Sequence, residues 1–324
     1  MRVLDIWHQG LIGYLCPSGR GQISALLHEI ELRQKMKSKD IVYVKGSFVP
    51  RAEARISVED RGFVFGDGVY EVVRVISGRL FAARFHNERL KRSLDGVRIS
   101  LSAADSPERF VEIGKQLLRE NGLIEGQATL YIQVTRGAAT RAHNFPQPEV
   151  PPTVYISVAR FMPYSDLGLT GAPAISHPDL RWGRCDLKTL NLLPNVLASQ
   201  TAKEKGAFEA MLIRDGVVTE GTKTNFFGVV DGSLRTHPSD THILPGITRS
   251  VLRDLAREVN IDLDETPIRS DEIPRLSELF LTGTTTDVMP VVKLDDKPVG
   301  KGKPGELTRK LQRVLAESLA SGGD

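Results

Sequence analysis

The feature that most constrains this chain is one lysine, Lys188, and the change in sequence on either side of it. A polar, strand-like stretch at 182–187 precedes it, and a long amphipathic run that ends at Gly206 follows. The side chains that recur in this run at helical spacing are Leu192, Leu193, Val196, Leu197 and Gln200. Packing on both sides would fix the lysine backbone while its amine points into a cleft. Most lysines are solvated surface charges, however, so the downstream segments decide how Lys188 is interpreted.

Downstream of the lysine, a predicted strand at 208–216 leads into the motif TEGTKTNFF at 219–227. This motif places a carboxylate, Glu220, beside a glycine, two threonines and an asparagine. A lysine, an acidic partner and a hydroxyl-rich turn, in this order, are what pyridoxal phosphate chemistry requires. The lysine forms the Schiff base, the carboxylate keeps the pyridine nitrogen protonated, and hydroxyls with backbone amides hold the phosphate.

On these residues the chain resembles the fold-type IV pyridoxal-phosphate transaminases, and most closely the D-amino acid aminotransferases. The resemblance runs from about Ile41 almost to the C-terminus. It implies a two-domain α/β (α+β) fold in which the cofactor, pyridoxal 5'-phosphate, lies between a smaller N-terminal α/β domain and a larger C-terminal domain, and it implies a homodimer. The expected division is an N-terminal extension at 1–40, the small domain at 41–162, a linker at 163–169 and the large domain at 170–324.

Charge and cysteine content argue against several other classes of protein. The net charge is +3, from 43 basic and 40 acidic residues, whereas a protein that binds nucleic acid or an anionic membrane has a clear basic excess. No apolar run approaches the length of a membrane span. The two cysteines, Cys16 and Cys185, provide neither a disulfide framework nor a metal cluster. We therefore expect a protein of a reducing compartment, the cytoplasm, without a metal site.

The first residues of the chain form a separate segment. Their apolar stretch is interrupted by Asp5, His8 and Gln9, and no small-residue cleavage site follows, so we expect no secretory signal. Residues 23–40 have the pattern of a short amphipathic helix. Met36 stands just before the resemblance begins, so residues 1–35 are either an accessory arm or lie upstream of the start that is used.

The segment after residue 40 predicts a small sheet with helices. The expected elements are a hairpin about Lys45–Gly46 at 41–49 that 55–59 continues, strands at 70–76, 80–85, 128–137 and 153–164, and helices from His86 and from Pro107. A glycine-rich loop precedes Tyr70 and can aim its side chain at a cleft. The resemblance implies that Tyr70 faces the substrate and that Arg89 binds the cofactor phosphate, a task suited to a planar donor fork.

A polar loop at 138–152 contains four prolines and the motif RAH. Arg141 and His143 are two residues apart, so in an extended backbone both side chains point to one side. Such a basic pair either binds a carboxylate or is simply solvated. In the D-amino acid aminotransferases, a pair of this kind clamps the substrate α-carboxylate across the dimer, and branched-chain transaminases lack it here. The resemblance therefore makes RAH the most discriminating motif of the chain.

The C-terminal part alternates predicted strands and helices. A strand at 172–176 precedes the lysine, and Pro245–Gly246 opens a helix whose free amide groups favour an anion. A strand at 279–292 ends in hydroxyls, and a helix closes the chain. The resemblance assigns cofactor binding to Ile247, Thr248 and Thr285, and substrate binding to Thr284.

The expected reaction is transamination, in which D-alanine and 2-oxoglutarate give pyruvate and D-glutamate. Lys188 is the expected catalytic residue, because it would both hold the cofactor and move the proton at the substrate Cα. Glu220 would stabilise the protonated pyridine. One departure from the family is Lys223, which stands between Thr222 and Thr224 where a run of serines is typical. It places a cation near the site and bears on substrate preference.

Several alternatives use the same lysine and glutamate. A lyase of the 4-amino-4-deoxychorismate type has no evident need for the RAH pair, and branched-chain or amine transamination comes next. A non-enzymatic cofactor carrier would combine an intact lysine with a degraded substrate site. The presence of Tyr70, Arg141 and His143 argues against that last class.

Overall fold

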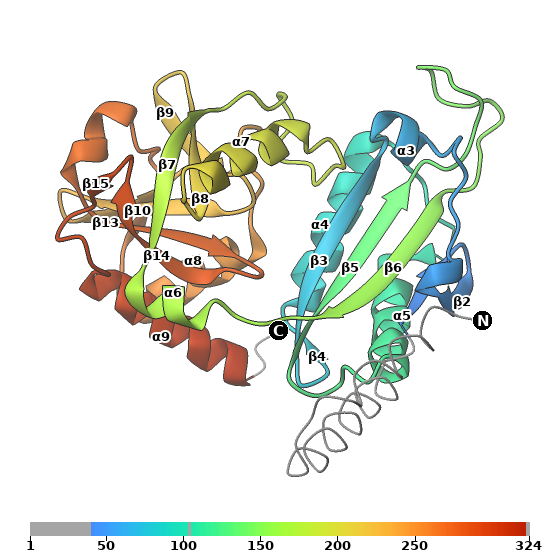
Figure 1. Ribbon diagram of the computed structural model, residues 1–324, viewed down its shortest axis with the longest axis horizontal. Helices are drawn as coiled ribbons and strands as arrows, with labels where there is room; N and C mark the ends of the chain where they lie inside the picture. Colours follow the sequence, from blue (N-terminus) through green and yellow to red (C-terminus); the bar gives the residue numbers. More distant parts are fainter. Residues whose placement is uncertain (1–39, 103–104, 322–324) are drawn as a thin grey trace, which may run out of the picture. The chain divides into compact units, whose positions relative to one another are not determined.

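The computed structural model describes residues 40–102 and 105–321, and from Ile41 onward these form two β-sheets with helices packed on them (Figure 1). The first sheet has six strands, all antiparallel to their neighbours, in the order β2-β1-β6-β5-β3-β4. They are β1 (Ile41–Val44), β2 (Ser47–Pro50), β3 (Gly68–Ile76), β4 (Arg79–Leu80), β5 (Gln127–Thr135) and β6 (Thr153–Arg160). The predicted hairpin about Lys45–Gly46 is confirmed, because Val44 pairs with Ser47 across that turn.

Two helices pack on the six-stranded sheet, α4 (Ala83–Val97) and α5 (Pro107–Glu120). The start of α5 follows the sequence prediction, since the Ser106 hydroxyl accepts a hydrogen bond from the Arg109 N–H at 3.3 Å and Pro107 opens the first turn. Phe110 and Leu117 of α5 are fully buried with alternate side chains of β5 and β6 in one apolar core. Removal of this apolar surface from water is the main force that holds the helices on the sheet.

The chain between β2 and β3 departs from the sequence prediction. A single 3-10 turn, η2 (Arg51–Glu53), follows β2, and the Ala54 N–H closes it by donating to the Pro50 and Arg51 carbonyls. Residues 55–59 therefore leave the hairpin and form no strand. A short helix, α3 (Arg61–Phe65), replaces the expected loop, and Gly66 ends it with a φ of +66°, a conformation that favours glycine.

The second sheet has nine strands, eight of them in the order β12-β11-β10-β13-β14-β7-β8-β9, with β15 paired to β14. They are β7 (Ala172–Pro178), β8 (Glu209–Arg214), β9 (Val217–Gly221), β10 (Asn225–Val230), β11 (Ser233–Thr236), β12 (Leu263–Asp264), β13 (Leu276–Gly283), β14 (Asp287–Leu294) and β15 (Lys297–Pro298). β7 runs parallel to β8 and β14, and β12 runs parallel to β11, whereas the other pairs are antiparallel.

The helices of this second part are α6 (Ser165–Thr170), α7 (Leu193–Glu204), α8 (Ile247–Glu258), η4 (Ser270–Arg275) and α9 (Glu306–Ser321). α8 and α9 share a core with β10 and β13, in which the Phe227 and Phe280 rings stack 5.0 Å apart. α7 packs on β7 and β8 through Ala198 and Ala202. The helix predicted after Pro245–Gly246 and the closing helix are thus present.

Three sequence predictions in this part are wrong. Residues 182–187 form no strand. Their backbone groups do not pair with a neighbouring strand; the Cys185 N–H, for example, donates to the Thr241 carbonyl. The stretch at 279–292 is two strands, β13 and β14, joined by a turn. The apolar stripe of α7 faces outward: Leu193, Val196 and Leu197 are 68%, 57% and 59% exposed. Two small alanines face the sheet instead and allow the helix to lie close to it.

The predicted linker at 163–169 overlaps α6, which lies between the last strand of the first sheet and the first strand of the second. The division into a small and a large domain at that point stays a prediction. The predicted extension at 1–40 and helix at 23–40 lie, apart from Asp40, outside the described residues. Among the helices that the structure describes, none has both the length and the apolarity needed to cross a membrane.

Candidate active site

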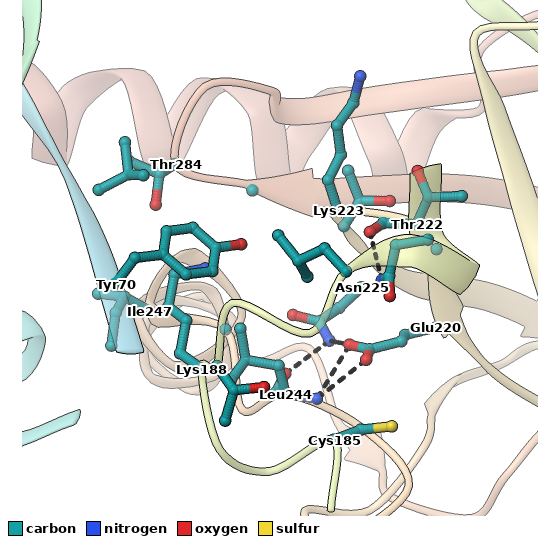
Figure 2. Close-up of a pocket in the computed structure, with 18 of the residues that line it drawn as sticks. Tyr70, Cys185, Lys188, Glu220, Thr222, Lys223, Asn225, Leu244, Ile247 and Thr284 are labelled. Atoms are coloured by element: carbon teal, nitrogen blue, oxygen red, sulfur yellow. Dashed lines mark hydrogen bonds between the residues drawn. The ribbon is translucent and has the colours of Figure 1, made fainter. Parts of the chain in front are cut away.

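A pocket brings together residues from both sheets, and most of the predicted site residues line it. They are Tyr70 of β3, Arg89 of α4, Lys188, Glu220 of β9, Ile247 and Thr248 at the start of α8, and Thr284 and Thr285 in the turn after β13. Figure 2 shows Tyr70 beside Lys188, with Glu220 on the opposite side of the cavity. The fold therefore assembles one cavity from segments that are far apart in the sequence.

Lys188 lies in an irregular segment that is tied to the start of β3. Its backbone N–H donates to the Ser93 hydroxyl at 3.1 Å, and its carbonyl accepts a hydrogen bond from the Tyr70 N–H at 3.0 Å. The amine Nζ lies 4.2 Å from the centre of the Tyr70 ring. The buried carboxylates Glu71 and Glu220 pair with arginines instead. The backbone of Lys188 is thus fixed, while its amine is available for chemistry in the pocket.

Glu220 is held in place by three donors, of which Figure 2 shows Asn225 and the Leu244 N–H. The Asn225 amide donates to Oε2 at 3.0 Å, the Leu244 N–H donates to both carboxylate oxygens at 3.0 and 3.1 Å, and Arg181 forms an ion pair with Oε1. Burial raises the pKa of Glu220 to about 7, against the opposing effect of Arg181. A carboxyl group that titrates near neutral pH and faces a pocket can exchange a proton with a ring nitrogen.

Arg181 is a functional residue that the sequence interpretation missed. Its Nε and Nη2 donate to the two oxygens of Asp179, each at 2.8 Å, and Nη2 also donates to the His242 carbonyl at 2.9 Å. Although burial disfavours the charge, hydrogen bonds from Arg181 lower the pKa of Asp179 to about 2. The guanidinium is thus fixed behind Glu220 and favours its ionised form. No local pattern indicates this role, because the partners of Arg181 are set only by the fold.

One end of the pocket offers donors to an anion. α8 begins after Gly246 without a side-chain cap, so the N–H groups of Ile247 and Thr248 lack intrahelical partners and carry the positive end of the helix dipole. A Cβ on Gly246 would lie 2.1 Å from the Asn225 amide oxygen, so only glycine lets α8 start this close to the Glu220 network. Thr248 and Thr285, which both carry hydroxyls, line the same pocket. This end suits a phosphate group.

Arg89 reaches the pocket from α4 and is oriented by Glu71. Its Nε and Nη2 donate to the two Glu71 oxygens at 3.0 and 2.6 Å, and Nη1 donates to the Pro245 carbonyl at 3.1 Å. His86 contacts the same carboxylate at 3.0 Å. Although burial acts in the opposite direction, Arg89 and His86 lower the pKa of Glu71. Glu71 is a second residue that the sequence interpretation missed, and it leaves Arg89 with N–H donors to spare for an anion.

The turn after Glu220 differs from its sequence interpretation. The Thr222 hydroxyl donates to Glu209 Oε1 at 2.5 Å, and the Thr224 hydroxyl donates to Oε2 of the same residue at 2.9 Å. These donors are therefore committed to a buried carboxylate and cannot also donate to a phosphate. Lys223 is exposed at the pocket, and its side chain points away from Glu220, with Nζ 5.5 Å from the Phe208 ring centre.

Arg141 and His143 do not line this pocket. Both are exposed, and both flank the ring of Phe65: the Arg141 Cζ lies 5.2 Å from the ring centre, and the His143 ring lies 5.6 Å away, centre to centre. His143 contributes to a neighbouring cavity with Phe65 and Arg61. The two basic residues lie near one another as expected, and the cavity that His143 lines shares Trp182, Leu187, Thr189 and Asn191 with the pocket of Lys188.

The pocket residues fit the group that the sequence predicts. An amine, a carboxyl group and an anion-binding helix start lie around one cavity, and these are the groups that a phosphorylated pyridine ring with a reactive carbonyl requires. Thr282 is among the residues of the same cavity, and its buried hydroxyl has no hydrogen-bond partner. A buried polar atom without a partner is costly, so a ligand that offers it a hydrogen bond would be stabilised here.

Comparison with known proteins supports this chemistry. A family model described as amino-transferase class IV matches residues 68–294. A D-alanine aminotransferase of Staphylococcus aureus is 41% identical over 281 residues, 86% of this chain and 98% of that protein. A D-alanine aminotransferase of Bacillus licheniformis is 39% identical over 282 residues, 86% of this chain and 97% of that protein.

Solved structures of branched-chain amino acid aminotransferases superpose on this chain. The enzyme of Escherichia coli does so with a TM-score of 0.77 at 26% identity, over 85% of this chain and 93% of that one. An enzyme of T.th., crystallised with pyridoxamine 5'-phosphate, does so with a TM-score of 0.78 at 27% identity, over 87% of this chain and 94% of that one. The predicted fold class, α/β (α+β) of fold type IV, is thereby confirmed, and the structure builds it from two sheets.

Proposed function

The chain belongs to the class IV aminotransferase family, and on that premise we propose that it transfers amino groups between D-amino acids and 2-oxo acids with pyridoxal 5'-phosphate. The preferred reaction converts D-alanine and 2-oxoglutarate into pyruvate and D-glutamate. One observation carries the proposal: Lys188 and Glu220 face each other across one pocket, in a chain 41% identical to a D-alanine aminotransferase. The absence of a basic excess gives no support to a nucleic-acid partner.

Pyridoxal 5'-phosphate, when bound, supplies a carbonyl that takes up the amino group and a ring that withdraws electrons from the substrate Cα. Arg89, Ile247, Thr248 and Thr285 are the residues that would bind its phosphate, since they surround the anion-binding end of the pocket. Glu220, supported by Arg181, would face the ring nitrogen and keep a proton on it. Its pKa of about 7 allows that exchange near neutral pH.

Lys188 performs the proton transfer at the substrate. Its amine is the base at the centre of the pocket, and Tyr70 lies against it at 4.2 Å. A positioned acid–base group of this kind contributes roughly 10²- to 10⁴-fold in rate. Because the amine acts from one side only, the hand of the product depends on where the substrate carboxylate is held. Tyr70 and Thr284 are placed to contact the substrate.

The carboxylate clamp requires a second copy of the chain. Arg141 and His143 are exposed and lie outside the pocket of their own chain. We propose that in a homodimer, acting in the cytoplasm, this loop reaches the partner's pocket and binds the substrate α-carboxylate there. The arginine fork and the imidazole suit a carboxylate in geometry and charge. Branched-chain transamination is the second candidate, since aminotransferases of that kind superpose on this chain, although at only 26% and 27% identity.

The test is a kinetic comparison of wild type and Arg141→Ala with D-alanine, L-alanine and L-leucine. Truncation of one partner of a buried charge pair typically costs about 2–5 kcal/mol. We therefore expect kcat/KM for D-alanine to fall by roughly 30-fold or more, while the absorbance of the bound cofactor stays normal. A wild type that prefers either L-amino acid, or a variant with wild-type kcat/KM, would refute the D-specific assignment.

A further inference from the structure

We infer that α3 is the platform that fixes the geometry of the Arg141–His143 pair, with Arg61 and Phe65 as its positioning residues. This inference rests on the proposed function for its catalytic consequence, but its structural part stands alone. Figure 1 shows α3 at the same end of the first sheet as the loop between β5 and β6. Arg61 and Phe65 are four residues apart and therefore share one face of this short helix.

Arg61 binds the backbone of the loop between β5 and β6 through its guanidinium group. Its Nη1 donates to the Ala142 carbonyl at 2.6 Å and to the Asn144 carbonyl at 3.3 Å, and its Nη2 donates to the His143 carbonyl at 3.3 Å. One guanidinium therefore holds three consecutive peptide units of the RAH segment. The Arg61 side chain is only 5% exposed, so these charge-assisted bonds are little weakened by water.

Asp67 and Arg136 anchor Arg61 in turn. The Arg61 Nε donates to Asp67 Oδ2 at 2.8 Å, and Arg136 donates to both oxygens of the same carboxylate at 2.8 and 2.9 Å. Although burial acts in the opposite direction, these bonds from Arg136 and Arg61 lower the pKa of Asp67. The Arg136 guanidinium also stacks 3.6 Å from the centre of the Phe145 ring. The segment that carries the clamp is therefore tied, through Arg61 and through Arg136, to one partly buried carboxylate.

Phe65 positions the side chains as Arg61 positions the backbone. The Arg61 Cζ lies 4.8 Å and the Arg141 Cζ 5.2 Å from the centre of the Phe65 ring, and the centre of the His143 ring lies 5.6 Å from it. An aromatic face attracts a guanidinium and restricts the orientations that an exposed arginine would otherwise sample. Both basic side chains thus lie against one ring.

The backbone around α3 is built for this close approach. The Arg61 N–H donates to the Gly137 carbonyl at 2.9 Å, and the Ala139 N–H donates to the Glu59 carbonyl at 3.1 Å. A Cβ on Gly62 would lie 2.2 Å from the Thr135 methyl group, so glycine alone lets α3 pack directly on the end of β5. The loop therefore leaves β5 already joined to the helix that orients its basic pair.

The test compares Arg61→Lys with wild type in two measurements. Lysine keeps a cation beside Asp67 but lacks the planar fork that reaches three carbonyls. We expect the KM for D-alanine to rise about 10- to 100-fold with a smaller change in kcat and with unchanged cofactor absorbance. Trypsin cleavage after Arg141, mapped by mass spectrometry, should become about tenfold faster, the change expected from loss of one charge-assisted bond.

The matched control is Arg55→Lys, since Arg55 is an exposed arginine that also donates to backbone carbonyls, those of Ala52 and Ala54. It should leave both measurements at the wild-type level. Phe65→Leu is the second variant, and it should raise KM in the same way. The unfolding midpoint and the cofactor content show whether Arg61→Lys folds. If it does not, the KM of Phe65→Leu decides the question.

Non-additivity separates positioning from a general loss of stability. If Arg61 acts through the clamp, Arg61→Lys should lower kcat/KM by less in an Arg141→Ala background than in wild type, because only the positioning of His143 is left to lose. Wild-type KM and cleavage rate in Arg61→Lys, or fully additive losses in the double variant, would overturn the inference. A faster cleavage with an unchanged KM would support the structural part and overturn the catalytic part, because α3 would hold the loop without serving the substrate. If wild type shows no activity with D-alanine, the proposed function fails, and the cleavage rate alone decides whether α3 is the platform.

Discussion

At the scale of single residues, the site is a set of charges whose partners set their protonation. Glu220 is buried, and burial raises its pKa to about 7. Arg181 and the Leu244 N–H oppose this and favour the carboxylate. A protonated ring nitrogen beside Glu220 would act in the same direction as Arg181. Binding of a cationic ring beside Glu220 would therefore lower the pKa of the carboxyl group and favour its ionised form.

The raised pKa of Glu220 predicts that the free energy of unfolding of the cofactor-free protein depends on pH. The pKa of Glu220 in the folded state, about 7, lies above its ordinary value of 4.5, so the folded state binds this proton more tightly than the unfolded state. The contribution of Glu220 to the free energy of unfolding should therefore fall, by about 3 kcal/mol at most, as pH rises from about 4.5 to about 7. Urea unfolding of wild type and Glu220→Gln at several pH values measures it. A stability difference between the two proteins that does not change with pH would contradict the assignment.

Sequence reasoning located the principal residues of the pocket but not what supports them. Lys188 and Glu220 stand in segments with distinctive local chemistry, and both face the cavity. Arg181, Glu71 and Arg61 act through partners that only the fold brings near, so each has the appearance of a surface charge in the sequence. The Thr222 and Thr224 hydroxyls were expected to hold a phosphate, yet Glu209, a buried acid outside the motif, accepts both.

At the scale of elements, the start of α8 decides how well the pocket binds an anion. Its first turn presents the N–H groups of Ile247 and Thr248, and Gly246 permits contact with Asn225. The pattern of a proline and a glycine before an apolar run predicted this helix correctly. The outward stripe of α7 was not predictable in the same way, because periodicity identifies an apolar face without showing what covers it.

We predict that Gly246→Ala weakens cofactor binding about tenfold or more. The new Cβ would lie 2.1 Å from the Asn225 amide oxygen, so either the helix start or the Glu220 network must move, at a cost of roughly 1–3 kcal/mol. Equilibrium dialysis with pyridoxal 5'-phosphate measures the affinity. Gly168→Ala is the matched control, because its Cβ would meet only the Gln312 amide at 4.0 Å. Equal affinity of the two variants would show that the close approach at Gly246 does not matter.

At the scale of the whole molecule, every strand of both sheets and every residue that lines the pocket lies at Ile41 or beyond it in the sequence. The Staphylococcus aureus relative matches over 98% of its own length but over 86% of this chain, so the additional residues here have no counterpart in it. The resemblance begins at about Ile41, and the division of the chain at that point stays a prediction. The family resemblance implied the α/β fold of type IV, whereas the local pattern alone also favoured a strand at 182–187 that the structure does not contain.

We therefore predict that removal of residues 1–35, with Met36 as the new start, leaves activity with D-alanine within about threefold of the full chain. The physical reason is that the described core buries its own apolar side chains in both sheets. Steady-state kinetics and sedimentation of the two proteins provide the comparison. Loss of folding, of activity or of the dimer in the shorter protein would instead assign a structural role to the first segment.

The most direct test of the central claim is a half-reaction without a second substrate. Purified protein loaded with pyridoxal 5'-phosphate is mixed with D-alanine, L-alanine or L-leucine, and the absorbance of the bound cofactor is followed, with pyruvate measured at the end. We predict stoichiometric conversion to the pyridoxamine form with D-alanine, little with either L-amino acid, and none in Lys188→Ala. Faster conversion with L-leucine than with D-alanine, or no conversion with any amino acid, would contradict the account.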